Sequence, residues 1–217
     1  MKPVQERAAE RARMVSSQLA ARGICDARVL AAMGEVPREA FVPHTHAAQA
    51  YSDSALPLPQ GQTISQPYMV GRAAELASLS ASDVVLDVGL GSGYQAAVLS
   101  RMCARVVGIE LLPELAQRAE QTLRELGFDN VEVQVGDGSL GYAAAAPYDA
   151  ILVAAAAPRP PQALIDQLRI GGRLVVPIGD RELQTMTVIT RTRDGVTSVE
   201  HDRCVYVPLL GADGFAT

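Results

Sequence analysis

The second half of the chain alternates short apolar runs with helix-like segments, and this pattern limits the possible folds more than any other feature. Residues 84–88 read Val-Val-Leu-Asp-Val, a nearly continuous apolar run typical of a parallel strand covered on both faces. Similar runs occur at 106–110, 131–135, 149–154, 173–178, 186–190 and 205–209. Seven strands separated by helices predict an α/β fold with one open, mostly parallel sheet and right-handed crossovers.

The connection between the second and third runs supports this prediction. Pro113 suits the first turn of a helix, and apolar residues then recur on one face until Gly127. Those apolar residues are Leu115, Ala119, Leu123 and Leu126.

The first 66 residues have a different pattern. Residues 7–21 favour a helix that stops at Gly23, and a second short helix is predicted to begin at Asp26. Four prolines and Gly61 between residues 42 and 67 predict a loop, and long loops in compact domains are often functional. We therefore predict an N-terminal helical segment with a functional loop at 1–66 and an α/β part at 67–217, both within one domain.

Composition excludes several classes of protein. The net charge of −5 disfavours nucleic-acid binding, and no apolar run is long enough for a membrane-spanning helix. The N-terminal residues do not resemble a signal peptide, and the cysteines Cys25, Cys103 and Cys204 are widely spaced. We expect a cytoplasmic protein, monomeric, with no nucleic-acid or membrane partner.

A glycine-rich loop from Asp87 to Tyr94 follows the first strand. Glycines at such a turn let the backbone approach a ligand at the carboxyl edge of the sheet. The spacing is GxGxG, with Tyr94 where a dinucleotide fingerprint would have glycine. Together with an acidic strand end, it favours a cationic cofactor without pyrophosphate, and S-adenosylmethionine fits this description.

Two further acidic residues end the next strands. Glu110 stands where an acidic side chain accepts hydrogen bonds from ribose hydroxyls, and Asp137, before Gly138, could accept from the adenine amino group. A single strand-end aspartate is more often a turn or cap residue. Three carboxylates at successive strand ends favour cofactor binding instead.

The acceptor is predicted to be an oxygen that arrives charged. A carboxylate is already ionised at neutral pH, so methyl transfer to it needs no general base, and positioning supplies most of the acceleration. Residues 154–158 read Ala-Ala-Ala-Ala-Pro, without the polar turn common in enzymes that methylate amino groups. The spacing of His44, His46 and His201 favours loop or surface histidines, so no metal site is predicted.

Ser65 has two interpretations. Its hydroxyl could hydrogen-bond a substrate carboxylate and orient it, or it could cap a helix whose first turn contains Pro67. Spacing alone favours the cap.

The motifs together resemble one known family. Residues 56–70, with Gly-Gln-Thr-Ile-Ser-Gln-Pro-Tyr-Met-Val at 61–70, are similar to the signature of protein-L-isoaspartate (D-aspartate) O-methyltransferases. Further matches follow in order at 93–99, 136–138, 146–151, 155–158, 171–179 and 206–209, so the resemblance spans nearly the whole chain.

The resemblance implies a seven-stranded, Rossmann-like methyltransferase fold with an N-terminal helical extension, and repair of isoaspartyl sites in damaged proteins. It implies that Ser65 and Thr63 are catalytic and that S-adenosylmethionine is converted to S-adenosylhomocysteine. The implied cofactor residues are Asp87, Gly89, Gly91, Gly93, Glu110, Leu111, Asp137 and Gly138. The implied substrate-binding residues are Ile64, Ser65, Val205, Tyr206 and Val207.

Two departures from the family pattern leave alternatives open. Leu90 replaces a small or hydroxylated residue, so it could crowd the cofactor or pack beneath the loop, and Ala154 removes a possible hydroxyl contact. Methylation of a free small acid, and a binding protein without turnover, are the alternative functions.

Overall fold

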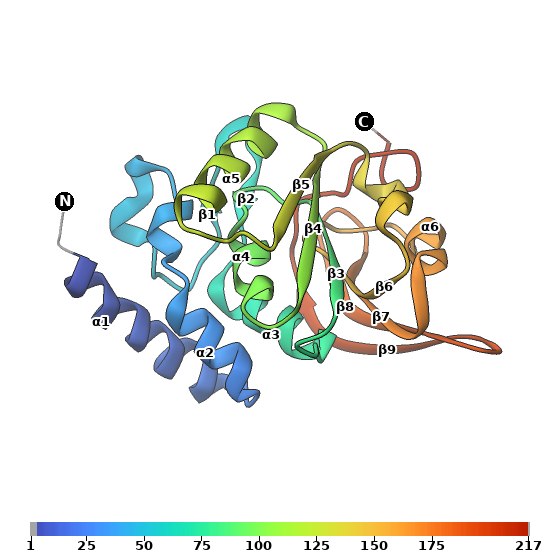
Figure 1. Ribbon diagram of the computed structural model, residues 1–217, viewed down its shortest axis with the longest axis horizontal. Coiled ribbons are helices and arrows are strands. Elements are labelled where there is room, and N and C mark those ends of the chain that lie inside the picture. Colours follow the sequence, from blue (N-terminus) through green and yellow to red (C-terminus); the bar gives the residue numbers. More distant parts are fainter. Residues whose placement is uncertain (1–3, 217) are drawn as a thin grey trace.

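The computed structural model, which describes residues 4–216, contains a seven-stranded sheet between two layers of helices (Figure 1). The sheet order is β5-β4-β3-β6-β7-β8-β9, parallel from β5 to β7, while β8 runs antiparallel to both of its neighbours. The strands are β3 (Val84–Val88), β4 (Arg105–Glu110), β5 (Val131–Val135), β6 (Tyr148–Val153), β7 (Leu168–Gly179), β8 (Gln184–Thr192) and β9 (Gly195–Cys204). The predicted fold class is confirmed.

The seventh strand is not the one that the sequence predicted. The predicted strand at Val205–Leu209 is wrong, because these residues follow β9 and form only an isolated bridge, between Pro208 and Ala156. β9 is an edge strand whose residues are mostly exposed, so it carries polar side chains and lacks an apolar run. Apolar residues favour burial, but within this terminal segment only Tyr206 and Leu209 are buried, and Val205 is exposed.

Helices cover both faces of the sheet. One face carries α3 (Pro67–Ala77), α4 (Tyr94–Ser100) and α5 (Pro113–Glu125), and the other carries α6 (Gln162–Asp166) with short 3-10 turns. Alternate residues of β3 enter the two cores: Val85 packs with the first layer and Leu86 with the second. The predicted helix after Pro113 is confirmed. Within residues 4–216 no helix is long and apolar enough to cross a membrane.

The helices of the N-terminal segment, residues 4–66, pack outside α3 and α4 (Figure 1). α1 (Val4–Met14) continues into a π-helical turn at Val15–Leu19 and a 3-10 turn at Ala20–Arg22, and Gly23 ends it with a φ of 94°. α2 (Ala27–Glu35) begins after Asp26, whose side chain accepts a hydrogen bond from the Arg28 amide at 2.8 Å. Both predicted helical regions are confirmed, and only the π-helical turn was not anticipated.

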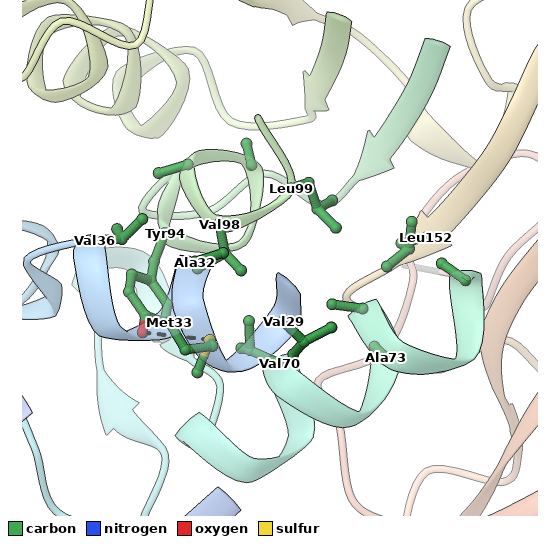
Figure 2. Packing of buried hydrophobic residues seen from close by; sticks show 14 of the residues in the cluster. Val29, Ala32, Met33, Val36, Val70, Ala73, Tyr94, Val98, Leu99 and Leu152 are labelled. Carbon is green, nitrogen blue, oxygen red and sulfur yellow. Dashed lines mark hydrogen bonds between the residues drawn. The ribbon is translucent and has the colours of Figure 1, made fainter. Parts of the chain in front are cut away.

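Apolar packing joins this segment to the sheet domain. Figure 2 shows Val29 and Met33 of α2 facing Val70 of α3 and Tyr94 and Val98 of α4. These residues belong to the same buried cluster as the strand residues on that face, so the N-terminal segment shares the core of the sheet.

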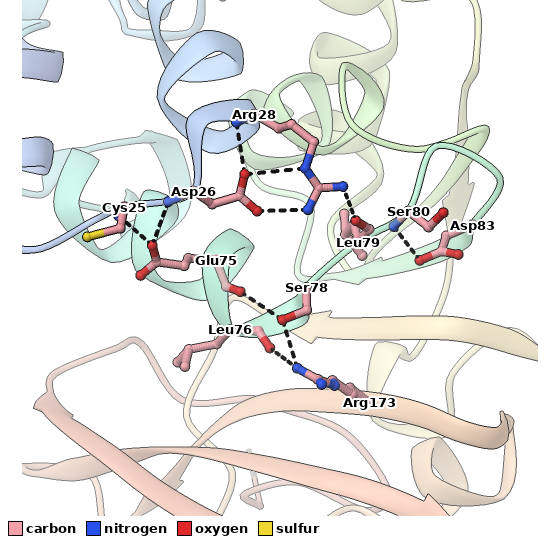
Figure 3. A network of polar contacts seen from close by, with 10 residues as sticks. All are labelled: Cys25, Asp26, Arg28, Glu75, Leu76, Ser78, Leu79, Ser80, Asp83 and Arg173. Carbon is pink, nitrogen blue, oxygen red and sulfur yellow. Dashed lines mark hydrogen bonds and ion pairs between the residues drawn. The ribbon is translucent and has the colours of Figure 1, made fainter.

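A polar network fastens the start of α2 to the end of α3 (Figure 3). The Glu75 carboxylate accepts hydrogen bonds from the amides of Cys25 and Asp26 at 2.6 and 3.0 Å. Arg28 donates to the carbonyl oxygen of Leu79, and Arg173 of β7 donates to the Ser78 hydroxyl at 2.8 Å.

The predicted loop at 42–66 contains no long element, as its prolines require. A 3-10 turn at Arg38–Phe41 precedes the loop, and another lies within it at His44–Gln49. The loop also forms a hairpin in which β1 (Leu56–Pro57) pairs with β2 (Thr63–Ile64), with a 3-10 turn at Pro59–Gly61 between the two strands. Ile64 is buried in the core, while Thr63 is exposed. The strand pairing and the burial of Ile64 therefore fix the backbone next to Thr63, and Ser65 lies at the carboxyl ends of the central strands.

Candidate active site

A cavity lies at the carboxyl ends of the central parallel strands, and we call it the strand-end cavity. It is lined by the ends of β3, β4 and β6 and by Gly138 after β5. The chain proceeds from β3 outward to β5 and then returns to the other side of β3 with β6, and such reversal points are where open α/β sheets bind ligands.

The glycine loop forms one wall of this cavity. Gly89, Gly91 and Gly93 have φ values of 78°, 55° and 85°. These lie in the left-handed region, which residues other than glycine rarely adopt. The loop is fixed by the carbonyl oxygen of Ile109, which accepts hydrogen bonds from the amides of Gly89 and Leu90 at 3.0 and 3.1 Å. Gly89 and Gly91 line the cavity, whereas Gly93 packs against Ala119 and Leu123 of α5.

Glu110 connects this loop to the end of β4. One carboxylate oxygen accepts from the Gly91 amide at 2.8 Å and the other from the Leu112 amide at 3.0 Å. Glu110 and Leu111 both line the cavity. Each carboxylate oxygen can accept more than one hydrogen bond, so Glu110 retains capacity for ligand hydroxyls.

Asp87 lies beneath the loop and does not line the cavity. It is fully buried, its Oδ1 accepts from the Gln95 amide group at 2.7 Å, and its Oδ2 has no hydrogen-bond partner. Burial raises the pKa of Asp87 to about 7; the hydrogen bond from Gln95 opposes this shift, and the negative charge of Glu110 adds to it. Gln95 itself lines the cavity, so its side chain connects the buried Asp87 carboxylate to the site.

Asp137 is engaged elsewhere than the sequence suggested. Its Oδ1 accepts from the Ser139 amide and hydroxyl at 2.9 and 2.6 Å, and its Oδ2 accepts from the Ala212 amide at 2.8 Å. Burial acts to raise the pKa of Asp137, but these hydrogen bonds outweigh it and hold the pKa below its usual value. Asp137 thus tethers the C-terminal segment, while Gly138 lines the cavity. An adenine contact of Asp137 stays a prediction.

A second cavity, the outer cavity, adjoins the first. Thr63 and Ser65 line both cavities, and Val205 and Tyr206 line the outer one together with Arg22 and Arg203. Val207 lines the strand-end cavity, and its carbonyl oxygen accepts from the Ala156 amide at 2.8 Å. Thr63 and Ser65, which the family resemblance predicts to be catalytic, therefore stand where the two cavities meet.

Ser65 is not a helix cap. The N-cap position of α3 is Gln66, and no side chain caps this helix. The preferred interpretation from spacing is therefore wrong, because the helix begins one residue later than a Ser65 cap requires. Burial raises the pKa of Tyr206 above its usual value, and a hydrogen bond with the Ser65 side chain opposes this shift.

Leu90 packs beneath the loop without closing the cavity. Its side chain occupies the space over Gly108 of β4, where an added Cβ would lie 2.6 Å from the Leu90 Cδ1. The bulk at position 90 is therefore matched by the absence of a side chain at position 108. Ala154 also lines the cavity, and its amide donates to the carbonyl oxygen of Val88 at 2.8 Å.

Several residues lining the strand-end cavity were not predicted from the sequence. The clearest is Gln95, whose signal was a polar residue in the otherwise apolar helix after the glycine loop. Others are Gln62, Ser92, Leu112, Pro208, Leu209 and Leu210. Within the described part of the chain, no three histidine, cysteine or acidic side chains gather in a group that could hold a metal ion.

Comparison with known proteins agrees with this geometry. Residues 9–214 match the family model for protein-L-isoaspartate(D-aspartate) O-methyltransferase. A protein-L-isoaspartate O-methyltransferase 2 of Pelobacter propionicus is 52% identical over 204 residues, which cover 93% of this chain and 91% of that protein.

Solved structures agree as well. A protein-L-isoaspartate O-methyltransferase structure superimposes with a TM-score of 0.84 at 27% identity, covering 94% of this chain and 66% of that one. A putative enzyme of the same name from Plasmodium falciparum, solved with S-adenosyl-L-homocysteine, has the same fold with a TM-score of 0.80 at 24% identity, covering 92% of this chain and 98% of that one. This chain belongs to the protein-L-isoaspartate(D-aspartate) O-methyltransferase family.

Proposed function

We propose that this chain transfers a methyl group from S-adenosylmethionine to the free carboxylate of L-isoaspartyl residues in damaged proteins and peptides. One observation supports this assignment above all: the cavity at the strand ends meets an outer cavity at Thr63 and Ser65. A donor and a large acceptor can therefore approach each other from opposite sides of one pair of hydroxyls.

The strand-end cavity fits the donor. The left-handed glycines bring the loop backbone to the cavity wall, and an added Cβ at Gly138 would lie 2.8 Å from Val88. Gly89, Gly91, Leu111 and Gly138 would pack against the cofactor, and Glu110 would accept from its ribose hydroxyls. When bound, the sulfonium supplies an electrophilic methyl group and S-adenosylhomocysteine is the leaving product.

The outer cavity fits a peptide acceptor. Ser65, with Thr63, would hydrogen-bond the acceptor carboxylate and direct one oxygen toward the strand-end cavity. Ile64 holds this loop in the core, and the backbone of Val205, Tyr206 and Val207 would pair with the peptide. Among the described residues, neither cavity is lined by a histidine or a lysine, which is consistent with an acceptor that needs no general base.

A matched pair of peptides tests the proposal. We expect the wild-type protein to methylate the peptide containing isoaspartate and not the peptide containing aspartate, with S-adenosylhomocysteine released. Methylation of a free dicarboxylic acid in preference to the isoaspartyl peptide would favour the small-acid alternative. Binding of the donor without any turnover would favour the binding-protein alternative.

Substitution of Ser65 tests its role. Ser65→Ala should lower kcat on the isoaspartyl peptide by about tenfold or more, because a hydrogen bond to a charged group is lost, while affinity for S-adenosylhomocysteine should stay within about twofold. Ser54→Ala, an exposed serine of the same loop, is the control and should be unaffected. Equal turnover by Ser65→Ala and the wild type would exclude the assigned role.

The proposal extends to the range of acceptors, the compartment and the oligomeric state. D-aspartyl residues are a second proposed acceptor, because the family description includes them, and a D-aspartyl peptide tests this directly. We also propose a cytoplasmic monomer; Cys25, Cys103 and Cys204 are free thiols, as a reducing compartment would keep them. Sedimentation and cell fractionation are the corresponding measurements.

A further inference from the structure

A buried arginine in the N-terminal segment has no anionic partner among the side chains that the structure describes. Arg38 is completely buried, and its Nε donates to the carbonyl oxygen of Ala50 at 2.8 Å. Its two terminal nitrogens make no hydrogen bond of normal geometry, and no ion pair joins it to a carboxylate whose side chain the structure describes, in residues 7–216. Burial lowers the pKa of Arg38, and nearby Tyr94 and Tyr51 oppose this shift.

The guanidinium of Arg38 lies over the ring of Tyr94, with its Cζ 4.9 Å from the ring centroid. Tyr94 directly follows Gly93, begins α4 and lines the strand-end cavity. Two further contacts come from the N-terminal segment: Phe41 packs edge-on at 5.7 Å between ring centroids, and the Tyr94 hydroxyl donates to the Met33 sulfur at 3.7 Å (Figure 2). The residue that ends the glycine loop is therefore held from outside the sheet domain.

Stability does not explain why this position carries an arginine. Removing a cation from water is costly, and well-packed apolar replacements of buried charges are often neutral or stabilising. A cation over an aromatic ring is attracted more strongly when both are shielded from water. Breaches of ordinary packing rules concentrate at functional sites, and this one lies directly behind the cofactor loop.

We propose that Arg38 is a positioning residue for the methyl donor: through the ring of Tyr94 it holds the glycine loop in its binding conformation. The N-terminal segment thereby contributes to cofactor affinity without contacting the cofactor. The inference rests on the proposed donor site, and it can be tested by binding alone.

A second arginine at the junction between α4 and the N-terminal segment provides a matched control. Arg101, at the end of α4, lies 4.4 Å from the Phe128 ring centroid and forms an ion pair with Glu35 of α2 at 2.9 Å. It joins α4 to the N-terminal segment as Arg38 does, but at the end of the helix away from the glycine loop. Any effect of loosening this junction in general should appear in both variants.

The experiment compares Arg38→Met with Arg101→Met by calorimetric titration with S-adenosylhomocysteine and by thermal unfolding. Arg38→Met should bind the ligand about tenfold more weakly, as expected for the loss of a desolvated cation–π contact, while its unfolding temperature stays at or above the wild-type value. Arg101→Met should keep wild-type affinity. In turnover assays Arg38→Met should raise the KM for S-adenosylmethionine and leave kcat within about twofold, because the contact orders the binding loop.

A ring variant gives a second route if Arg38→Met does not fold. Tyr94→Leu removes the ring and should weaken binding like Arg38→Met, with no further loss in the double variant. Wild-type affinity in Arg38→Met, or a loss of affinity that only parallels a fall in unfolding temperature, would overturn the proposal. Wild-type turnover of the isoaspartyl peptide is measured separately, so failure of the proposed function would be distinguishable.

Discussion

The two sides of the active site are built in different ways. The donor side consists of turns at the ends of successive parallel strands: Glu110 ends β4, and the glycine loop and Gly138 follow β3 and β5 within a few residues. The acceptor side joins the hairpin loop around Ser65 to the terminal segment around Tyr206, which are remote in sequence. The donor side thus depends on backbone geometry within the sheet, and the acceptor side depends on how distant segments pack.

The largest effect should follow from breaking the donor side at Glu110. Glu110→Ala removes both acceptors that hold the Gly91 and Leu112 amides, and we expect affinity for S-adenosylhomocysteine to fall about a hundredfold, since hydrogen bonds to charged groups are strong. Titration calorimetry measures this. Glu120→Ala, an exposed residue of α5, is the control. Unchanged affinity in Glu110→Ala would mean that the loop orders itself without this carboxylate.

On the donor side, Asp87 is expected to make the free energy of unfolding depend on pH. Its folded pKa is raised to about 7, above the usual value of 3.8, so the folded state binds the proton more tightly than the unfolded state. Stability from this group is therefore full at low pH and is lost as pH rises toward 7. Asp87→Asn keeps an acceptor for Gln95 but cannot ionise. Its free energy of unfolding, relative to that of the wild type, should rise by on the order of 2 kcal/mol between about pH 5 and about pH 8.

Denaturant unfolding of both proteins across this pH range measures the difference. A constant difference would show that Asp87 ionises normally in the folded protein. Ser65→Ala, on the acceptor side, should show no such pH dependence.

A smaller effect should come from the fit between β4 and the glycine loop. In Gly108→Ala the new methyl group would displace Leu90 toward the cavity, and overpacking of this kind should weaken binding of S-adenosylhomocysteine about tenfold. Adding Leu90→Ala should restore much of that affinity, because it empties the contested space. If Leu90→Ala did not restore affinity in the double variant, the loss in Gly108→Ala would not come from a clash with Leu90.

The smallest effect should come from the residue that links the two sides. Asp137→Ala releases the Ala212 amide and should loosen the terminal segment, so we expect the KM for the isoaspartyl peptide to rise about threefold, with a smaller change in donor affinity. Asp180→Ala removes a similar aspartate that accepts from the amides of Glu182 and Leu183, and it should leave both constants unchanged. A change confined to donor affinity would favour the predicted adenine contact of Asp137.

The sequence predicted the donor side better than the acceptor side. Gly89, Gly91, Glu110, Leu111 and Gly138 all line the strand-end cavity. Except for Leu111, which only the family resemblance implies, their positions follow from local signals, because a strand end, a left-handed glycine and an acidic residue are each visible in a few neighbouring residues. The acidic side chains were less predictable, since the orientation of Asp87 and the tether at Asp137 depend on Gln95 and on Ala212.

On the acceptor side the family resemblance identified residues that local patterns did not. Spacing favours a helix cap at Ser65 and apolar content favours a strand in the terminal segment, and both predictions are wrong. Both errors have one cause: a short segment without regular hydrogen bonding takes its position from its neighbours. Exposure of β9 removed the apolar signal from the true seventh strand.

By itself the sequence determined the alternation of strands and helices, the left-handed turns and the presence of an adenosine-type cofactor site, because periodicity and glycine conformation act over a few residues. Only the tertiary structure decided that Leu90 fits over Gly108, that Arg38 lies behind Tyr94, and that two cavities meet at Ser65. These depend on side chains from separate segments occupying the same small space, and close packing sets that outcome for the folded chain as a whole.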